Sequence, residues 1–224
     1  PYNCQYSRAN RPTADGRLLI VDESEKLQND DLPQPEYESM LRHSLGNVVP
    51  YLNPGAAMYI WNGHRQFGPM HEILLGLNVH ISCVITWAKE SFALGFSDYN
   101  QQTEFCLYGW LEDNGAHRWY GPDNESTLWQ VKREAVADLY HPTQKPLALA
   151  HRALRNSTKR GDIVLDLFMG SGTTLIGAAG LNRVCYGMEI SPRWCDVAIR
   201  RYIDYVGREN APEPLVKRYM ESGV

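Results

Sequence analysis

Short apolar runs alternate along the chain with segments whose apolar residues recur at helical spacing. The apolar runs predict buried strands at 56–61, 80–89, 103–110, 162–168 and 183–190, and a strand pair near 117–120 and 127–131. The helical spacing predicts helices at 37–52, 67–77, 146–157, 173–181 and 192–207. Strands that alternate with helices indicate an α/β fold. We therefore expect a Rossmann-like domain with a mostly parallel, twisted sheet and helices on both faces.

The two ends of the chain lack this regular pattern. Residues 3–36 are polar, acidic and dotted with proline, which predicts a long surface loop or lid. Residues 208–224 read as a weak tail or an edge strand. A length of 224 residues suits one α/β domain and would be cramped for two. Because the chain begins with proline, we interpret its N-terminus as truncated.

Charge and composition exclude little. The net charge is -4, and all of it comes from residues 1–40, because residues 41–224 carry equal numbers of basic and acidic side chains. A nucleic-acid partner is therefore neither supported nor excluded. The chain contains no apolar run of the roughly 18 residues that a membrane span needs, so we expect no membrane partner. Its five cysteines are scattered and do not pair with histidines at ligand spacing, which indicates reduced cytoplasmic thiols and no metal site.

A glycine turn carries the clearest chemical signal. The sequence VLDLFMGSGTT is an apolar strand followed by Gly170, Ser171 and Gly172 and then a helix start. Such a turn lets a ligand approach the backbone and the helix N-terminus closely. Glu189 ends the next predicted strand, nineteen residues after Gly170, where an acid can accept hydrogen bonds from both hydroxyls of a ribose.

The turn does not fit every nucleotide equally well. A nicotinamide-cofactor site would need a third glycine where Leu175 stands, and a triphosphate loop would need a Gly-Lys-Ser/Thr sequence, which is absent. A ligand with an adenosine and no phosphates suits the residues best, and S-adenosylmethionine is such a ligand. A tight turn that binds no ligand is the structural alternative.

A second motif lies about twenty-five residues upstream. Residues 141–160 carry five Lys/Arg and no acid, and begin with the proline-bracketed turn HPTQKP. Together, HPTQKP and VLDLFMGSGTT resemble two successive motifs of the β-class DNA amino-methyltransferases, whose circularly permuted order places the catalytic half first. The resemblance extends over roughly 37–207, through LGFSDYNQQTEFCLYGW, STLWQVKR and YGMEISPRWCDVAIRRY. It is similar to phage and prophage adenine-specific enzymes, which often carry an upstream ParB-like domain.

The resemblance implies a set of site residues. S-adenosylmethionine is the expected cofactor. Its methionine part would be surrounded by the glycine turn and its ribose held by Glu189. The expected cofactor-binding residues are Thr143, Lys145, Asp166, Phe168, Gly170, Ser171, Gly172, Thr173 and Glu189. Thr143 and Lys145 would lie near the carboxylate of the cofactor, where a cation and a helix N-terminus both favour an anion.

The resemblance also implies where the target base binds. The family's catalytic motif is Asp/Asn/Ser-Pro-Pro-Tyr, so Pro1 and Tyr2 would be its last two residues, with Tyr2 stacking on a flipped base. Tyr99 and Glu104 would belong to the base pocket. Trp87, Trp129 and Trp194 are expected to serve packing and not base stacking.

The expected organisation is one methyltransferase domain over 1–224. A catalytic and base-pocket half would cover 1–110, a short target-recognition region 111–140, a cofactor half 141–207 and a tail 208–224. The expected function is methylation of the exocyclic amine of adenine in double-stranded DNA. We expect the protein in the cytoplasm, associated with the nucleoid, with a homodimer left open. The alternatives are a cytosine-N4 methyltransferase, an inactive nucleic-acid-binding relative and a nicotinamide-dependent oxidoreductase.

Overall fold

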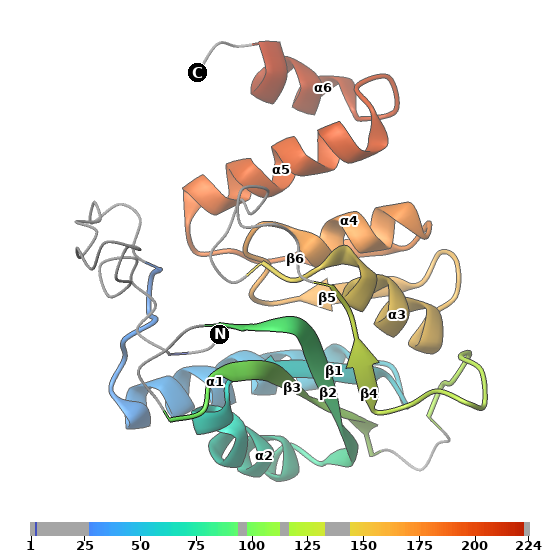
Figure 1. Cartoon of the computed structure of the whole chain (residues 1–224). Coiled ribbons are helices and arrows are strands. Elements are labelled where there is room, and N and C mark those ends of the chain that lie inside the picture. Colours follow the sequence, from blue (N-terminus) through green and yellow to red (C-terminus); the bar gives the residue numbers. More distant parts are fainter. Residues whose placement is uncertain (1–2, 4–26, 94–97, 113–116, 133–143, 222–224) are drawn as a thin grey trace.

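The structure is a computed structural model that describes residues 3, 27–93, 98–112, 117–132 and 144–221 (Figure 1). Its helices are α1 (Gln34–Val48), α2 (Phe67–Gly76), α3 (Leu147–Ser157), α4 (Thr173–Gly180), α5 (Pro192–Val206) and α6 (Glu213–Val216). Its strands are β1 (Ala57–Asn62), β2 (Val79–Ala93), β3 (Gln101–Leu111), β4 (Leu128–Gln130), β5 (Ile163–Asp166) and β6 (Val184–Gly187). Each predicted helix and all but one of the predicted strands have a counterpart here.

The described strands form two sheets. One has the order β1-β3-β2-β4 and the other pairs β5 with β6. Strand β3 runs antiparallel to β1 and β2, whereas β4 is parallel to β2, so three of the four strands in the larger sheet share one direction. The β5–β6 ladder is parallel and lies above the larger sheet in Figure 1. An α/β fold is therefore confirmed, but the expected single, mostly parallel sheet is not found within the described residues: two of the three ladders in the larger sheet are antiparallel, and β5 and β6 form a separate parallel sheet.

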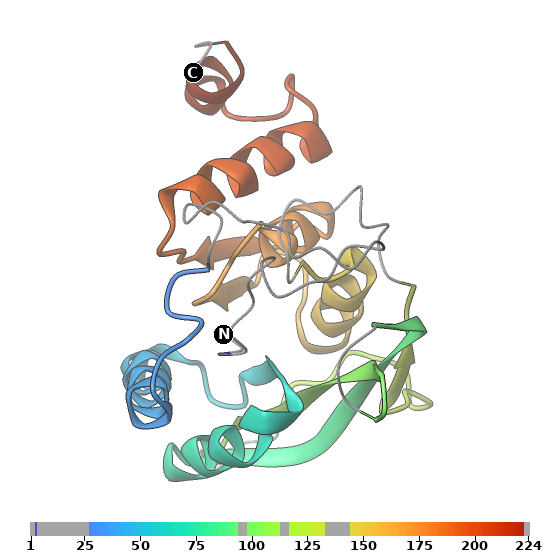
Figure 2. The same cartoon turned by 60° about the vertical axis from the view of Figure 1, so that its left-hand side comes forward.

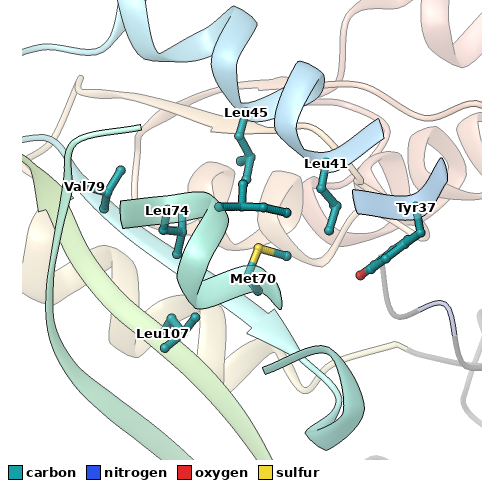
Figure 3. Packing of buried hydrophobic residues seen from close by; sticks show 8 residues of the cluster. Tyr37, Leu41, Leu45, Met70, Leu74, Val79 and Leu107 are labelled. Atoms are coloured by element: carbon teal, nitrogen blue, oxygen red, sulfur yellow. The ribbon is translucent and has the colours of Figure 1, made fainter. Parts of the chain in front are cut away.

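Helices α1 and α2 cover one face of the larger sheet and form the first core with it (Figures 2 and 3). Their apolar residues recur at helical spacing, so one stripe of each helix meets the sheet. Helix α1 contributes Leu41 and Leu45, α2 contributes Met70 and Leu74, and the sheet contributes Leu107; all are almost fully buried.

The opposite face of the larger sheet holds a second, aromatic core. Trp87 on β2, Trp129 on β4 and Leu149 on α3 are each at most 2% exposed. The indole N–H of Trp87 donates to the carbonyl of Val131, and that of Trp129 donates to the carbonyl of Ser126. These two tryptophans are packing residues, as the sequence predicts. Helix α3 thus holds the second half of the chain against this face.

The β5–β6 sheet is covered unevenly. Helix α4 packs on β6 and on its neighbours α3 and α5. On the strands themselves, Ile163 pairs with Val184 and Leu165 with Tyr186, so these four side chains share one face. All four are exposed. The expectation of helices on both faces is therefore wrong for this sheet within the described part of the chain.

Two predicted elements differ from the structure. Residues 117–120 form no strand, because the N–H of Tyr120 donates to the carbonyl of Asn156 at the end of α3, and His117 stacks on Trp110 with ring centroids 4.0 Å apart. The tail is helical over Glu213–Val216 and continues as a wider helical turn over Lys217–Glu221. Pro212 caps the start of this helix, and Pro214 lies in its first turn. Proline suits both positions better than it suits an edge strand.

The neighbouring leucines of α2 test the first core. Leu74 is 1% exposed and Leu75 is 48% exposed. We expect Leu74→Ala to lower the free energy of unfolding by about 2–5 kcal/mol, because it leaves a cavity in the core. Leu75→Ala is the matched control and should change it by less than about 1 kcal/mol. Urea unfolding of both variants measures the difference, and equal losses would show that this core does not support the fold.

Candidate functional site

The glycine turn lies where β5 ends and α4 begins. Gly170 and Gly172 adopt φ values of +53° and +83°, in the left-handed region that glycine enters at low cost. A carboxylate oxygen of Asp166 accepts the N–H of Phe168 at 3.0 Å, and the carbonyl of Met169 accepts the N–H of Gly172 at 2.9 Å. Both contacts reverse the chain within the turn and direct the N-terminus of α4 toward the site.

Gly172 has a second reason to be glycine. A Cβ atom added there would lie 2.9 Å from the Cβ of Ala198 on α5. The missing side chain therefore lets α5 pack directly against the turn. Close packing of α5 is therefore a further role of this glycine, beside the sharp turn and the close approach of a ligand that the sequence indicates.

Glu189 is tied to the glycine turn by its carboxylate. One oxygen accepts the N–H of Gly170 at 2.8 Å and the other accepts the N–H of Ser191 at 3.0 Å. Because a carboxylate has about four acceptor positions, two hydrogen bonds from the backbone leave capacity for further donors. The turn and the acid that the sequence predicts as one site are therefore joined, and the acid is held in a fixed orientation.

The basic turn ahead of α3 contacts the same glycine turn. The hydroxyl of Ser171 donates to the side-chain oxygen of Gln144 at 3.1 Å, and the hydroxyl of Thr173 donates to the carbonyl of Lys145 at 3.2 Å. From the other side, the guanidinium of Arg201 on α5 donates to the carbonyl of Ser171 at 2.6 Å. The two motifs of the sequence thus form one structural unit.

The ammonium group of Lys145 reaches the larger sheet. It lies 3.1 Å from one carboxylate oxygen of Glu104 on β3, while the ammonium of Lys89 on β2 lies 2.6 Å from the other. The side chains of Lys89 and Lys145 are 9% and 16% exposed. Burial alone would raise the pKa of Glu104, but the two lysines outweigh it and lower the pKa to about 2. Glu104 is therefore an ionised carboxylate between two ammonium groups.

Two tryptophans border this charged row. The ammonium of Lys89 lies 5.0 Å from the centre of the Trp87 ring, and that of Lys145 lies 5.5 Å from the centre of the Trp61 ring. The two rings meet edge to face at 6.4 Å. A cation over an aromatic face adds a further attraction where water is scarce.

The other predicted site residues are placed differently. Tyr99 is 87% exposed and lies two residues ahead of β3, the strand that carries Glu104. Phe168 is half-exposed beside the glycine turn. Pro1, Tyr2 and Thr143 lie outside the described residues, as does most of the predicted lid.

Three contributors to the site were not predicted from the sequence: Lys89, Gln144 and Arg201. Lys89 could have been found, because it follows Trp87 by two residues on a strand and so shares its face. Arg201 lies on a helix far from the motifs, and nothing in the sequence indicates that it contacts Ser171.

Two negative findings hold for the described residues. Within them, no group of three or more histidine, cysteine, aspartate or glutamate side chains could hold a metal ion. No helix in that same part of the chain is long and apolar enough to cross a membrane.

With this geometry in place, sequence comparison decides the family. The profile described as DNA methylase, which covers N6 and N4 methyltransferases, matches residues 1–200. The chain belongs to the N6/N4 DNA methylase family. The type II methyltransferase M.HpaI of Haemophilus parainfluenzae is 46% identical over 193 residues, which are 77% of this chain and 62% of the relative. The matched part of the chain spans 60% and 62% of the length of two of the curated relatives and 22–49% of the length of three others.

Solved structures agree with this family. The crystal structure of the M1.HpyAVI–SAM complex has a TM-score of 0.67 and 28% identity, over 76% of this chain and 84% of that one. The PvuII cytosine-N4-specific DNA methyltransferase has a TM-score of 0.69 over 90% of this chain and 82% of that one. Its 14% identity makes the likeness one of fold alone. S-adenosylmethionine, the expected cofactor, is confirmed for the family. The alternative of a nicotinamide-dependent oxidoreductase is thereby excluded.

Paired glycine variants test the tight contact between the turn and α5. Gly161 and Gly172 have nearly the same φ, +84° and +83°, but a Cβ on Gly161 would meet no atom within 4 Å. In both alanine variants, backbone strain should lower the free energy of unfolding by roughly 1–2 kcal/mol. Gly172→Ala should lower the free energy of unfolding by a further 1–3 kcal/mol or so, because it overpacks the contact with Ala198. Equal losses in urea unfolding would exclude this packing role.

The ionised state of Glu104 can be tested through pH. Its pKa is lowered from 4.5 to about 2, so the carboxylate stabilises the folded protein fully above pH 4.5, and this stabilisation is lost as the pH falls toward 2. Wild type should therefore exceed Glu104→Gln in free energy of unfolding by a constant amount from about pH 7 to pH 5, and by less toward about pH 3. Denaturant titrations at several pH values measure this difference. A difference that does not shrink would contradict the assignment.

Proposed function

We propose that this protein is an S-adenosylmethionine-dependent DNA methyltransferase that modifies the exocyclic amine of adenine in double-stranded DNA. The observation that carries the proposal is the joining of the two family motifs: the glycine turn with Glu189 contacts the basic turn, and Lys145 reaches the predicted base-pocket residue Glu104. The family match over residues 1–200 supports the reaction class.

The residues of the turn fit the cofactor. Glu189 presents a carboxylate oriented by two backbone N–H groups, and its remaining acceptor positions suit the two hydroxyls of a ribose. Asp166, Phe168, Gly170, Ser171, Gly172 and Thr173 lie on β5, in the turn and at the first residue of α4. When bound, S-adenosylmethionine supplies an electrophilic methyl group on a sulfonium.

A separate proposal concerns the residues that would lie near the carboxylate of the cofactor. Lys145 and Thr143 are the residues proposed to lie near it. The ammonium of Lys145 already pairs with Glu104, and its carbonyl accepts the hydroxyl of Thr173. Lys145 therefore takes part as one end of a charged row whose position is fixed.

On the substrate side, an exocyclic amine is a weak nucleophile because its lone pair is conjugated into the ring. Hydrogen-bond acceptors on the protein can hold the two amine hydrogens and localise the lone pair toward the methyl group. The protein would thereby hold the amine nitrogen in line with the methyl group that the bound cofactor would supply, and the proton released from the amine would pass to solvent. Such a reaction depends on positioning more than on a strong base.

The base is proposed to reach this site by flipping out of the duplex. Pro1 and Tyr2 are the proposed end of the catalytic motif, with Tyr2 stacking on the base; such stacking contributes on the order of 1–3 kcal/mol. Glu104 borders the pocket from β3. The exposed ring of Tyr99 suits a contact with DNA at the rim of the pocket.

The proposed organisation follows the halves described above, with 111–140 as the target-recognition region. The type II methyltransferases among the relatives favour a role in restriction–modification. Double-stranded DNA is the proposed partner. The β-class motif order, the phage-type origin, the ParB-like upstream domain, the homodimer and the cytoplasmic, nucleoid-associated location remain predictions.

Methylation of cytosine N4 is the second candidate, because a fold neighbour is described as cytosine-N4-specific. The two candidates differ in product. We expect the full-length protein, given S-adenosylmethionine with a tritiated methyl group and duplex DNA, to label N6-methyldeoxyadenosine after digestion to nucleosides. Label in N4-methyldeoxycytidine would establish the alternative, and an unlabelled duplex would point to the inactive relative.

The ribose assignment has its own test. Glu189→Ala should weaken S-adenosylmethionine binding by about 100-fold or more, since two charge-assisted hydrogen bonds contribute about 1.5–3 kcal/mol each. Calorimetric titration measures the affinity. Glu213→Ala, which removes an exposed acid at the start of α6, is the control and should bind like wild type. Unchanged affinity in Glu189→Ala would refute the assignment.

A further inference from the structure

The row formed by Lys89, Glu104 and Lys145 connects the two halves of the site. Lys89 and Glu104 belong to neighbouring strands of the larger sheet, whereas Lys145 belongs to the basic turn that contacts the glycine turn. An inference about this row rests on the proposed function, because that function assigns the base to one end and the cofactor to the other.

The register of the sheet explains how the row forms. Trp87 on β2 lies directly opposite Glu104 on β3. Lys89 follows Trp87 by two residues and therefore points to the same face, diagonal to Glu104. The lysine is 9% exposed and its ammonium lies 2.6 Å from the carboxylate. Lys89 is thus a buried, oriented cation and differs from the solvated lysines of the surface.

The other end of the row is fixed to the cofactor half by the backbone. The carbonyl of Lys145 accepts the hydroxyl of Thr173, the first residue of α4. The ammonium of the same residue holds the second oxygen of Glu104. A displacement of Glu104 therefore moves Lys145, and a displacement of Lys145 reaches the first turn of α4.

Electrostatics makes the three groups act together. The side chain of Glu104 is only 23% exposed, and its carboxylate stays ionised because cations lie on both of its oxygens. Removal of Lys89 leaves Lys145 as the cation of the row, and the carboxylate is then free to turn toward it. The position of Lys145 relative to the glycine turn consequently depends on Lys89, which contacts neither Thr173 nor the turn in the hydrogen bonds and ion pairs of the described residues.

We propose that Lys89 is a positioning residue: it holds Glu104, and through it Lys145, so that binding of the target base and binding of the cofactor strengthen each other. The strengthening is mutual, because a coupling free energy between two ligands is the same in both directions. Lys89 acts through Glu104 and does not need to touch either ligand.

The test measures coupling with S-adenosylhomocysteine, which has no methyl group to transfer. Its affinity is measured by calorimetry, first without DNA and then with a saturating duplex that carries the target site. In wild type, the duplex should tighten binding by about tenfold, within the 5–150-fold typical of coupled sites. In Lys89→Met that ratio should fall to about one, whatever the affinity of the variant without DNA.

Four further variants make the result specific. Lys159→Met removes a lysine that also lies over an aromatic ring, 4.7 Å from the centre of Tyr120, but beyond the C-terminal end of α3, and should keep the wild-type ratio. Lys89→Arg keeps the charge and should restore part of the coupling. Glu104→Gln should lose the coupling as fully as Lys89→Met, and the double variant should lose no more than either.

The outcomes separate this inference from the proposed function. If wild type binds S-adenosylhomocysteine and methylates DNA but Lys89→Met keeps the full ratio, the positioning role is wrong and the proposed function stands. If Lys159→Met loses the ratio as Lys89→Met does, the effect is general and the role is also overturned. If wild type binds no S-adenosylhomocysteine, both proposals fail. Circular dichroism of each variant confirms that the fold is intact.

Discussion

The ion pairs of Glu104 determine how the larger sheet and the glycine turn sit relative to each other. A single buried carboxylate would be costly in this position, and a buried pair that loses one partner typically loses about 3–5 kcal/mol. The two lysines come from different parts of the chain, β2 and the basic turn, so ionised Glu104 requires both to be in place. The two ion pairs of this carboxylate thus link the larger sheet to the basic turn that contacts the glycine turn.

The glycine turn is held by hydrogen bonds within the protein. Glu189 accepts two backbone N–H groups, and Arg201 and Gln144 contact Ser171. A ligand that enters such a site orders few side chains, which keeps the entropic loss of binding small. The left-handed backbone of the turn is stabilised from outside by α5, so the conformation that suits a ligand also suits the packing of the domain.

Local patterns predicted most of this architecture, and contacts distant in sequence account for the rest. The glycine turn and Glu189 follow from residue types and spacing. The ion pairs of Glu104 could not be predicted that way, because they depend on the register between β2 and β3 and on the docking of α3. Residues 117–120 look like part of a strand because they include the aromatic residues Trp119 and Tyr120, but Trp119 packs against the aromatic core and the backbone N–H of Tyr120 donates to a carbonyl of α3. Tertiary packing overrides local preference in each case.

The charge of the protein gains meaning only once burial is known. A net charge of -4 argues against DNA, and lysines near the site argue for it. Affinity for a phosphate backbone comes from cations that are free to neutralise phosphates and release their counterions. Lys89 and Lys145 are almost buried and paired with a carboxylate, so they cannot serve in this way. Their positive charge serves to hold Glu104 within the site. Attraction to the proposed DNA partner has to arise from other, exposed cations of the protein.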